Sequence, residues 1–337
     1  MLYVTTRNSK DAVTAYHALV ENRGADGGLY VPLHLPKLTE QQLKHLCNMS
    51  YGQCIAEFLN LFCSSKLTGW DVDFAIGRYP VRIEPLAHRI LMAESWHNPD
   101  GQYRRLENNL KDLLQAKTDL SGAWVSVAVR MAVMAGIFTN RDAWNTGPVD
   151  IATISGDCTL LISAWYLRKM GFPIGNIVCC CNENKQLWDL LCNGQMRTDG
   201  ISISTIVPQA DVTLPVNLER LIFDCGGALE TNRYLECCSL GEIYSVSEPA
   251  LQQLRQGMFA SVVSTERVEA TIPNVYKTHG YVLSPDAALA YSGLQDYRVK
   301  TGITGTAIIL CDNSPVCDGE MIAQAMGISV AQLRSLF

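Results

Sequence analysis

The segment from Asp150 to Asn182 constrains the fold more than any other part of the sequence. It reads DIATISGDCTLLISAWYLRKMGFPIGNIVCCCN: an apolar run, a turn, an amphipathic stretch that stops at Gly171, and a second apolar run. Apolar runs on either side of an amphipathic helix are typical of a βαβ unit, in which the two strands are parallel. The sequence therefore predicts an α/β fold with a parallel sheet flanked by helices.

Polar residues follow both predicted strands of this unit. Ser155, Gly156 and Asp157 come after the first strand, and Asn182 and Asn184 come after the second. Ligands of open parallel sheets bind beyond the carboxyl ends of the strands, so these residues are the natural candidates for a pocket. The alternative is that they form ordinary turns and helix caps, which select the same residue types. The sequence favours this structural interpretation.

The first ninety residues predict a small α/β unit. A turn at Ala25–Gly28 leads into a short strand at Leu29–Val31, and helical patterns cover Glu40–Asn48 and Tyr51–Cys63. We expect two domains, residues 1–90 and residues 91–337.

The last sixty residues predict further elements of the same kind. The stretch THGYVLSPDAALAYSGLQDY predicts a short strand, a turn at Ser284–Asp286 and a helix. GTAIILC, which ends at Cys311, predicts a buried strand, and terminal helices follow it.

Composition excludes several classes of protein. Of the residues, 48% are hydrophobic and 18% are charged, and the net charge of −6 with scattered Lys and Arg argues against a nucleic-acid partner. The longest apolar segment, Ala123–Phe138, is interrupted by Arg130 and is too short to span a bilayer. No leader pattern is visible, so we expect a cytoplasmic protein without a membrane partner. The 13 cysteines lack zinc-site spacing, and we expect reduced thiols and no metal.

Several phrases resemble the threonine synthase family, which uses pyridoxal phosphate and has the tryptophan-synthase-β-like fold. ALVENRGADGGLYVP near the N-terminus is similar to the family's opening domain, and the Asp150–Asn182 segment is similar to its phosphate-loop strand and helix. VPQADVTLPVNLERLIFD and GYVLSPDAALAY resemble two later family segments. The resemblance covers most of residues 1–90 and 150–312. It implies a parallel-sheet core of the fold-type II pyridoxal-phosphate kind.

The resemblance also implies that the catalytic lysine is missing. The family segment reads His-Gly-Pro-Thr, two apolar residues, then Phe-Lys-Asp. Aligned on His97 and Pro99, it places Arg104 at the Schiff-base lysine. A guanidinium stays protonated and cannot replace an amine nucleophile. A shifted register would offer Lys111 instead, but we expect Lys111 to be solvated on a polar helix face. His97 is either an acid-base group of a pocket or a residue that packs beside the altered loop.

Other family positions have changed as well. In the loop that should bind phosphate, Ser155 and Gly156 match the family, but Asp157 replaces an amide and Thr159 replaces a glycine. An aspartate there would repel phosphate while capping the helix. Cys311 begins the segment that replaces the family's Thr-Ala-His-Pro loop, and Asp286 replaces its substrate-facing histidine.

A whole subdomain is also expected to be absent. Arg104 and Ser155 are 51 positions apart. A single βαβ unit already takes about thirty residues, so this interval is too short for the whole mobile α/β subdomain that the family carries there. The stretch LSGAWVSVAVRMAVMAGIF, residues 120–138, resembles only the helix that follows that subdomain.

Three functional hypotheses follow. The first is a catalytically inactive threonine synthase-like protein, retained for binding, regulation or partnering with itself or with a full-length paralogue, and with no cofactor. The second is a pyridoxal-phosphate-dependent lyase that converts O-phosphohomoserine to threonine with an unorthodox lysine or a noncovalent cofactor. The third is a structural remnant without a ligand. The first predicts no catalytic residue and a relict pocket formed by His97, Asn98, Ser155, Gly156, Asp157, Asn182, Asn184 and Cys311.

Overall fold

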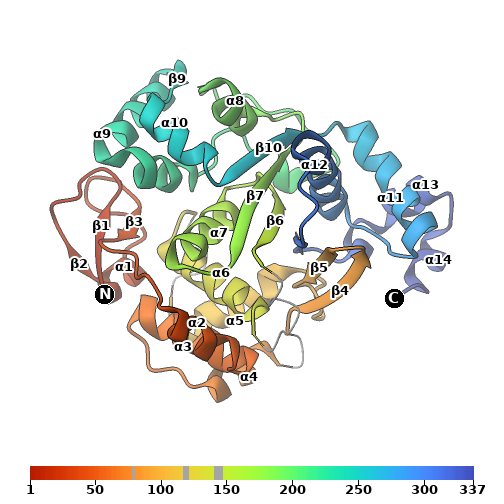
Figure 1. The fold of residues 1–337 in the computed structure, drawn as a ribbon, viewed down its shortest axis with the longest axis horizontal. Helices are drawn as coiled ribbons and strands as arrows, with labels where there is room; N and C mark the ends of the chain where they lie inside the picture. The colour runs from red at the N-terminus through yellow and green to blue at the C-terminus, as the bar shows by residue number, and fades with distance from the viewer. Residues whose placement is uncertain (78–79, 117–120, 140–146) are drawn as a thin grey trace.

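A six-stranded, largely parallel sheet forms the centre of the molecule (Figure 1). The computed structural model describes residues 1–77, 80–116, 121–139 and 147–337. Along the sheet the strand order is β10, β7, β6, β11, β5, β4, and only the edge pair of β4 and β5 is antiparallel. The strands span Met258–Val262 (β10), Ile174–Cys181 (β7), Val149–Ile154 (β6), Ala307–Cys311 (β11), Ile90–Glu94 (β5) and Arg82–Ala87 (β4).

The βαβ unit predicted from the sequence is present. β6 leads into α7 (Thr159–Met170), which ends at Gly171 with a φ of 104°, and the chain returns through β7 parallel to β6. Cys179, Cys180 and Cys181 are completely buried in β7, as expected for thiols that pack like small apolar side chains.

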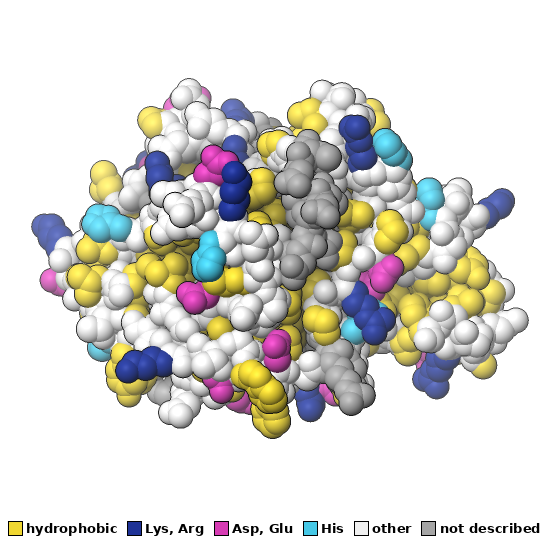
Figure 2. Space-filling model, turned by 60° about the horizontal axis from the view of Figure 1, so that its bottom comes forward, with side chains coloured by type: hydrophobic (Ala, Val, Ile, Leu, Met, Phe, Trp, Pro, Cys, Tyr) yellow, Lys and Arg dark blue, Asp and Glu magenta, His cyan; other side chains and the backbone are white. Residues whose placement is uncertain are grey.

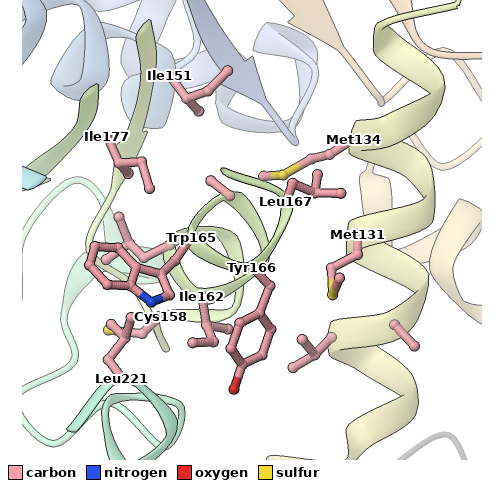
Figure 3. Close-up of a cluster of buried hydrophobic side chains, with 14 of the residues drawn as sticks. Met131, Met134, Ile151, Cys158, Ile162, Trp165, Tyr166, Leu167, Ile177 and Leu221 are labelled. Carbon is pink, nitrogen blue, oxygen red and sulfur yellow. The ribbon is translucent and has the colours of Figure 1, made fainter. Parts of the chain in front are cut away.

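The main core lies between α7, the sheet and α6 (Trp124–Ile137). Every residue of α6 apart from Ser126 is buried, which is the pattern of a helix enclosed on all sides. In Figure 3, Met131 and Met134 of α6 point toward α7, and Leu167 of α7 lies beside Met134. This packing fixes α6 and the start of α7 relative to the carboxyl ends of the strands.

The N-terminal part contains a small antiparallel sheet and four helices. The sheet has the order β2, β1, β3, and α3 packs against α6. The predicted helices at Glu40–Asn48 and Tyr51–Cys63 are found almost as expected. The elements are β1 (Leu2–Thr5), β2 (Val13–Thr14), β3 (Tyr30–Pro32), α1 (Ala15–Val20), α2 (Glu40–Cys47), α3 (Tyr51–Cys63) and α4 (Gly69–Ile76).

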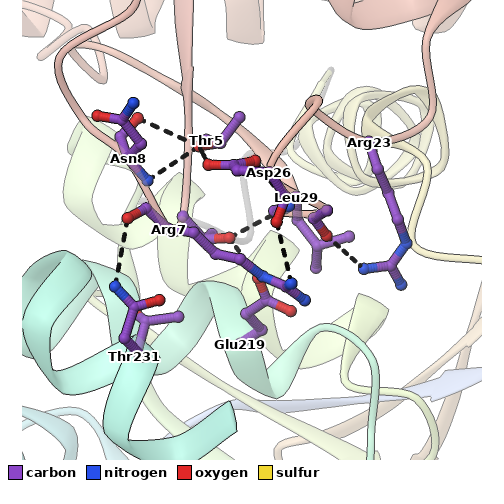
Figure 4. Close-up of polar contacts among 12 residues, drawn as sticks. Thr5, Arg7, Asn8, Arg23, Asp26, Leu29, Glu219 and Thr231 are labelled. Atoms are coloured by element: carbon purple, nitrogen blue, oxygen red, sulfur yellow. Dashed lines mark hydrogen bonds and ion pairs between the residues drawn. The ribbon is translucent and has the colours of Figure 1, made fainter. Parts of the chain in front are cut away.

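A polar contact fixes the N-terminal part against α9 (Leu218–Leu240), as Figure 4 shows. Glu219 accepts a hydrogen bond from the Thr6 hydroxyl and lies 3.6 Å from Nε of Arg7. Nη1 of Arg7 in turn donates to the carbonyl of Asp26 at 3.1 Å. The Ala25–Gly28 turn needs a glycine at Gly27, where φ is +76° and a Cβ would lie 2.8 Å from the Arg7 guanidinium.

The remaining elements surround the sheet. They are α5 (Tyr103–Leu113), α8 (Gln186–Asn193), β8 (Gln195–Arg197), η2 (Pro208–Ala210), β9 (Ile243–Ser245), α10 (Glu248–Arg255), α11 (Thr265–His279), α12 (Pro285–Thr301), η3 (Pro315–Asp318), α13 (Gly319–Met326) and α14 (Val330–Arg334). The predicted strand before Ser284 is wrong. α11 runs to His279, and Tyr281–Leu283 connect it to α12 without joining a sheet.

The region between α5 and β6 contains α6 as its only helix, and no strand, among the residues that the structure describes. Within these described residues, the fold therefore has no second α/β layer before β6. Over the described ranges, none of the helices is both long and apolar enough to cross a membrane.

Candidate functional site

A cavity of about 320 Å³ lies at the carboxyl ends of the central strands. It lies between the loop after β6, the residue that follows β11, and side chains of α5 and α6. Its lining residues are Glu107, Ser126, Arg130, Ile154, Ser155, Gly156, Asp157, Thr159, Leu160, Pro208, Gln209, Val212 and Asp312. We call it the central cavity.

Asp157 accepts hydrogen bonds from Thr159 at the start of α7. Its Oδ1 accepts the backbone N–H of Thr159 at 2.8 Å, and its Oδ2 accepts the Thr159 hydroxyl, also at 2.8 Å. Asn217 donates to the same hydroxyl at 2.8 Å. The negative charge therefore stands where a helix favours an anion, and that anion is the protein's own carboxylate.

An ion pair closes the opposite side of the central cavity. Nη1 and Nη2 of Arg130 donate to the two carboxylate oxygens of Asp312 at 2.8 and 2.7 Å. The guanidinium lies over the ring of Tyr103, 3.1 Å from its centroid, and Ser95 donates to Oδ1 of Asp312 at 2.9 Å. Burial alone would lower the pKa of Arg130, but the adjacent Asp312 raises it above the ordinary value. The guanidinium of Arg130 is therefore charged at neutral pH.

The backbone reinforces this closure. The N–H of Tyr103 donates to the carbonyl of Asp312 at 2.7 Å, and the N–H of Ser314 donates to the carbonyl of Gly101 at 2.7 Å. Gln102 also forms a bridge with Asn313. The loop that precedes α5 is thus joined to the loop that follows β11.

Arg104 and Lys111 lie in unexpected environments. Arg104 is exposed on the first turn of α5 and does not line the central cavity. Lys111 is only 4% exposed, and its Nζ lies 2.6 Å from Oε1 of Glu107. The expectation that Lys111 is solvated is wrong, because α5 turns this position toward the protein.

The structure places the predicted pocket residues in several locations. Ser155, Gly156 and Asp157 line the central cavity. His97 and Asn98 line another cavity, on the far side of the loop before α5. The remaining predicted residues, Asn182, Asn184 and Cys311, line neither cavity.

Asn182 and Asn184 organise a loop instead. The Asn182 amide donates to Asp211 at 2.6 Å and to Thr205 at 2.9 Å. The Asn184 side chain bonds both the N–H and the carbonyl of Ile203, at 2.7 and 2.8 Å. These contacts match the turn interpretation that the sequence favoured. Cys311 is buried at the end of β11, where burial raises the pKa of its thiol.

Asp286 is a buried acid near the central cavity. It is 5% exposed, and its Oδ1 has no hydrogen-bond partner among the described residues. Burial raises the pKa of Asp286 to about 6, and the charge of Asp312 adds to this effect. Over the described part of the chain, no cluster of three or more His, Cys, Asp or Glu side chains is arranged to hold a metal ion.

Sequence reasoning missed Asp312 and Glu94 as important residues. Each stands at the carboxyl end of a strand, Glu94 as the last residue of β5 and Asp312 directly after β11. That position was the available signal, because it is where ligands of such sheets bind. The partner of Asp312, Arg130, lies 182 residues away in sequence, and no local pattern connects the two.

Comparisons with known proteins agree with this fold. A family model described as threonine synthase N terminus matches residues 2–78. Threonine synthase-like 1 of Homo sapiens is 29% identical over 167 residues, which are 48% of this chain and 22% of that protein. Threonine synthase of Pseudomonas aeruginosa is 27% identical over 140 residues, 41% of this chain and 30% of that protein. The chain thus spans less than a third of the length of these relatives.

Solved structures extend the likeness to the whole chain. The structure of a threonine synthase from Brucella melitensis with bound pyridoxal phosphate superposes with a TM-score of 0.87 at 18% identity, covering 100% of this chain and 94% of that one. Yeast threonine synthase gives a TM-score of 0.82 at 16% identity, covering 97% and 90%. The chain is thus similar to threonine synthases: its first residues match the family's N-terminal domain, and its fold is that of the two solved enzymes.

Proposed function

We propose that this chain is a catalytically inactive threonine synthase-like protein, retained to bind or regulate a partner chain. The observation that carries the proposal is the central cavity, where the protein's own charged groups take the places that a cofactor would need. Asp157 uses the helix N-terminus, and the pair of Arg130 and Asp312 closes the other side.

The residues present do not fit the phosphate of pyridoxal phosphate. A phosphate at a helix N-terminus needs free N–H donors and tolerates no adjacent anion. Here the Thr159 N–H is bonded to Asp157 at 2.8 Å. Glu107, Asp157 and Asp312 also bring three carboxylates to the cavity, against the single guanidinium of Arg130.

The residues present do not fit covalent attachment either. Arg104, the residue at the family's lysine position, is exposed, and a guanidinium cannot replace an amine nucleophile. Among the described residues, no lysine lines the central cavity. The proposal therefore assigns no catalytic step to this chain.

A titration with pyridoxal phosphate tests the proposal. Purified protein is incubated with the cofactor, treated with borohydride, dialysed and analysed by visible absorption and intact mass. We expect no retained chromophore and no mass increase, with a full-length threonine synthase treated in parallel as the positive control. A stoichiometric adduct would contradict the proposal.

One observation favours a second candidate function, a pyridoxal-phosphate-dependent lyase that uses Lys111. This lysine is buried beside Glu107, and Glu107 lines the central cavity. Burial is a usual way to prepare a lysine amine for reaction with a carbonyl. If an adduct forms in the titration and is lost in Lys111→Gln, while Lys169→Gln retains it, the lyase replaces our first proposal. Threonine formation from O-phosphohomoserine would then be the activity to measure.

Exposed aromatic side chains support the partnering part of the proposal. Trp70 and Phe74, one turn apart on α4, are 83% and 82% exposed. Neighbouring apolar side chains on a surface often mark a protein contact. Figure 2 shows hydrophobic side chains exposed between dispersed charges on the face that lies at the bottom of Figure 1.

Light scattering after gel filtration tests the partnering. We expect a homodimer, about twice the 37.2 kDa of one chain, that Trp70→Gln with Phe74→Gln converts to a monomer. The matched control is Leu229→Gln, at an α9 position that is 79% exposed. A wild-type monomer that also fails to bind a full-length paralogue would instead support a structural remnant.

A further inference from the structure

Glu94 and His97 form a polar pair beside a second cavity, separate from the central one. Oε2 of Glu94 lies 2.5 Å from Nε2 of His97, and its Oε1 accepts a hydrogen bond from the Tyr281 hydroxyl. Glu94 is only 4% exposed, so its carboxylate depends on these two donors. Burial raises the pKa of Tyr281, which keeps its hydroxyl protonated as a donor.

The His97 ring is held in one orientation. The indole of Trp96 stacks on the imidazole, with centroids 4.0 Å apart and an angle of 25° between the planes. Because Nε2 faces Glu94, Nδ1 is the nitrogen left for another partner, and in the described part of the chain it has none. A carboxylate that orients an imidazole, whose other nitrogen is free, is a common arrangement at functional sites.

The second cavity has a volume of about 470 Å³, which suits a small organic molecule. Its lining residues are Arg82, Trp96, His97, Asn98, Pro99, Asp100, Gly101, Ser314, Val316 and Cys317. Gly101 and Ser314 belong to the two joined loops that separate this cavity from the central one. We call it the His97 cavity.

Arg82 brings a positive charge to the His97 cavity. It pairs with Glu94 in the antiparallel register of β4 and β5, so both side chains leave the sheet on the same face. No described carboxylate lies within 4.0 Å of its guanidinium, although Glu84 is on the same face of β4. The cavity's own acid, Asp100, is paired with Arg105 at 3.1 Å.

Cys317 does not act as a nucleophile in this arrangement. Its Sγ lies 3.4 Å from the carbonyl of Gly101 and 3.8 Å from that of Asp100, so the thiol donates to the backbone and not to His97. Burial also raises the pKa of the Cys317 thiol. The groups available to a ligand are therefore the guanidinium, the imidazole and the indole face.

We propose that the His97 cavity binds a small organic oxyanion, a carboxylate or a phosphate ester, through Arg82 and His97. The guanidinium of Arg82 supplies paired donors that match an oxyanion. The imidazole, held by Glu94 and Trp96, supplies the second contact, and the indole covers the organic part. Glu94 is a positioning residue that acts through His97. This site is independent of the proposed loss of catalysis, since it shares no lining residue with the central cavity.

NMR of the protein labelled with ¹⁵N-histidine tests the proposal. The chain has 6 histidines, so the imidazole signals are few, and His97→Gln identifies the signal of His97. Succinate and inorganic phosphate are titrated separately to about 10 mM at constant ionic strength, with chloride as the blank, since weak single-site binding falls in this range. We expect a saturable shift of the His97 signal with at least one of the two anions. A shift with succinate alone identifies a carboxylate site, and a shift with phosphate alone identifies a phosphate site.

Three variants make the result specific. Arg82→Gln, at an exposed edge position that the fold tolerates, should weaken binding at least about fivefold, the loss expected for one charged contact. Arg104→Gln removes the same charge from an exposed position outside the cavity and should leave the affinity unchanged. Glu94→Gln should move the His97 signal before any ligand is added and weaken binding. The absence of a saturable shift with both anions, or equal losses in Arg82→Gln and Arg104→Gln, would overturn the proposal.

Discussion

Two buried arginines show how differently two regions of this molecule are built. Arg220, where the N-terminal part meets α9, is completely buried and bonds neutral acceptors: the carbonyl of Tyr30 at 3.0 Å, the carbonyl of Gly122 at 2.9 Å, and the side chain of Asn217. Arg130, in the central cavity, bonds the carboxylate of Asp312.

The pKa shifts of the two arginines have opposite signs. Burial lowers the pKa of Arg220 to about 10, because the lost hydration outweighs the charges of the nearby Glu219 and Asp157 carboxylates. Asp312 raises the pKa of Arg130. All three guanidinium nitrogens of Arg220 have partners, whereas Nε of Arg130 has none among the described residues. The hydrogen bonds of Arg220 are therefore complete, whereas those of Arg130 in the central cavity are not.

The largest effect is expected where the N-terminal part meets α9. Arg220→Met leaves the carbonyls of Tyr30 and Gly122 buried without donors, and we expect it to lower the free energy of unfolding by about 4 kcal/mol. Urea denaturation measures this loss. Arg104→Met, at an exposed position, serves as the control and should change stability by less than about 0.5 kcal/mol. A loss below about 1 kcal/mol for Arg220→Met would show that the contact is not what holds the two parts together.

A double-mutant cycle examines the other arginine. Arg130→Met should cost about 2 kcal/mol, since it leaves the half-buried Asp312 without its partner, and Asp312→Asn should cost about 3 kcal/mol, since it leaves the buried Arg130 without a carboxylate. The double variant should cost clearly less than the sum, with a coupling of about 2 kcal/mol, because it leaves no unpaired charge. If the loss in the double variant equals the sum of the two single losses in urea denaturation, the ion pair does not close the cavity.

The same comparison shows what the sequence can predict. The βαβ unit follows from local patterns, since apolar runs and a glycine stop are features of consecutive residues, and the helices at Glu40–Asn48 and Tyr51–Cys63 follow from spacing alone. The predicted strand before Ser284 failed because α11 continues to His279, and nothing local marks that end.

The site was harder to predict than the fold. Ser155, Gly156 and Asp157 were found because they directly follow a strand. The contact between Arg130 and Asp312, and the separation of His97 from the central cavity, depend on loops that are distant in sequence. The burial of Lys111 depends on which face of α5 meets the core, and a polar sequence such as NNLKDLL does not reveal that face.

Asp286 allows a test of the cavity region through pH. Burial raises its pKa from the ordinary value of 3.8 to about 6, so between these two pH values the folded state holds a proton that the unfolded state has lost. Stability is therefore lost as the pH rises from 3.8 to about 6, and Asp286→Asn should recover this loss. We expect a gain of about 2 kcal/mol at about pH 7.5 and about half of that at about pH 5. An equal gain at both pH values would assign the effect to packing instead of charge.

The smallest effect is expected at Arg104, although the sequence places it at the family's most important position. Arg104 is exposed on the first turn of α5, so Arg104→Lys should change stability by less than about 0.5 kcal/mol in urea denaturation. It should also fail to retain pyridoxal phosphate after borohydride and dialysis, because a solvated lysine keeps a pKa near ~10.4 and remains protonated. A lysine at position 104 cannot restore cofactor binding if that position does not face the central cavity. An adduct in Arg104→Lys that is absent from the wild type would show instead that one substitution removed the activity and that the cavity can still admit the cofactor.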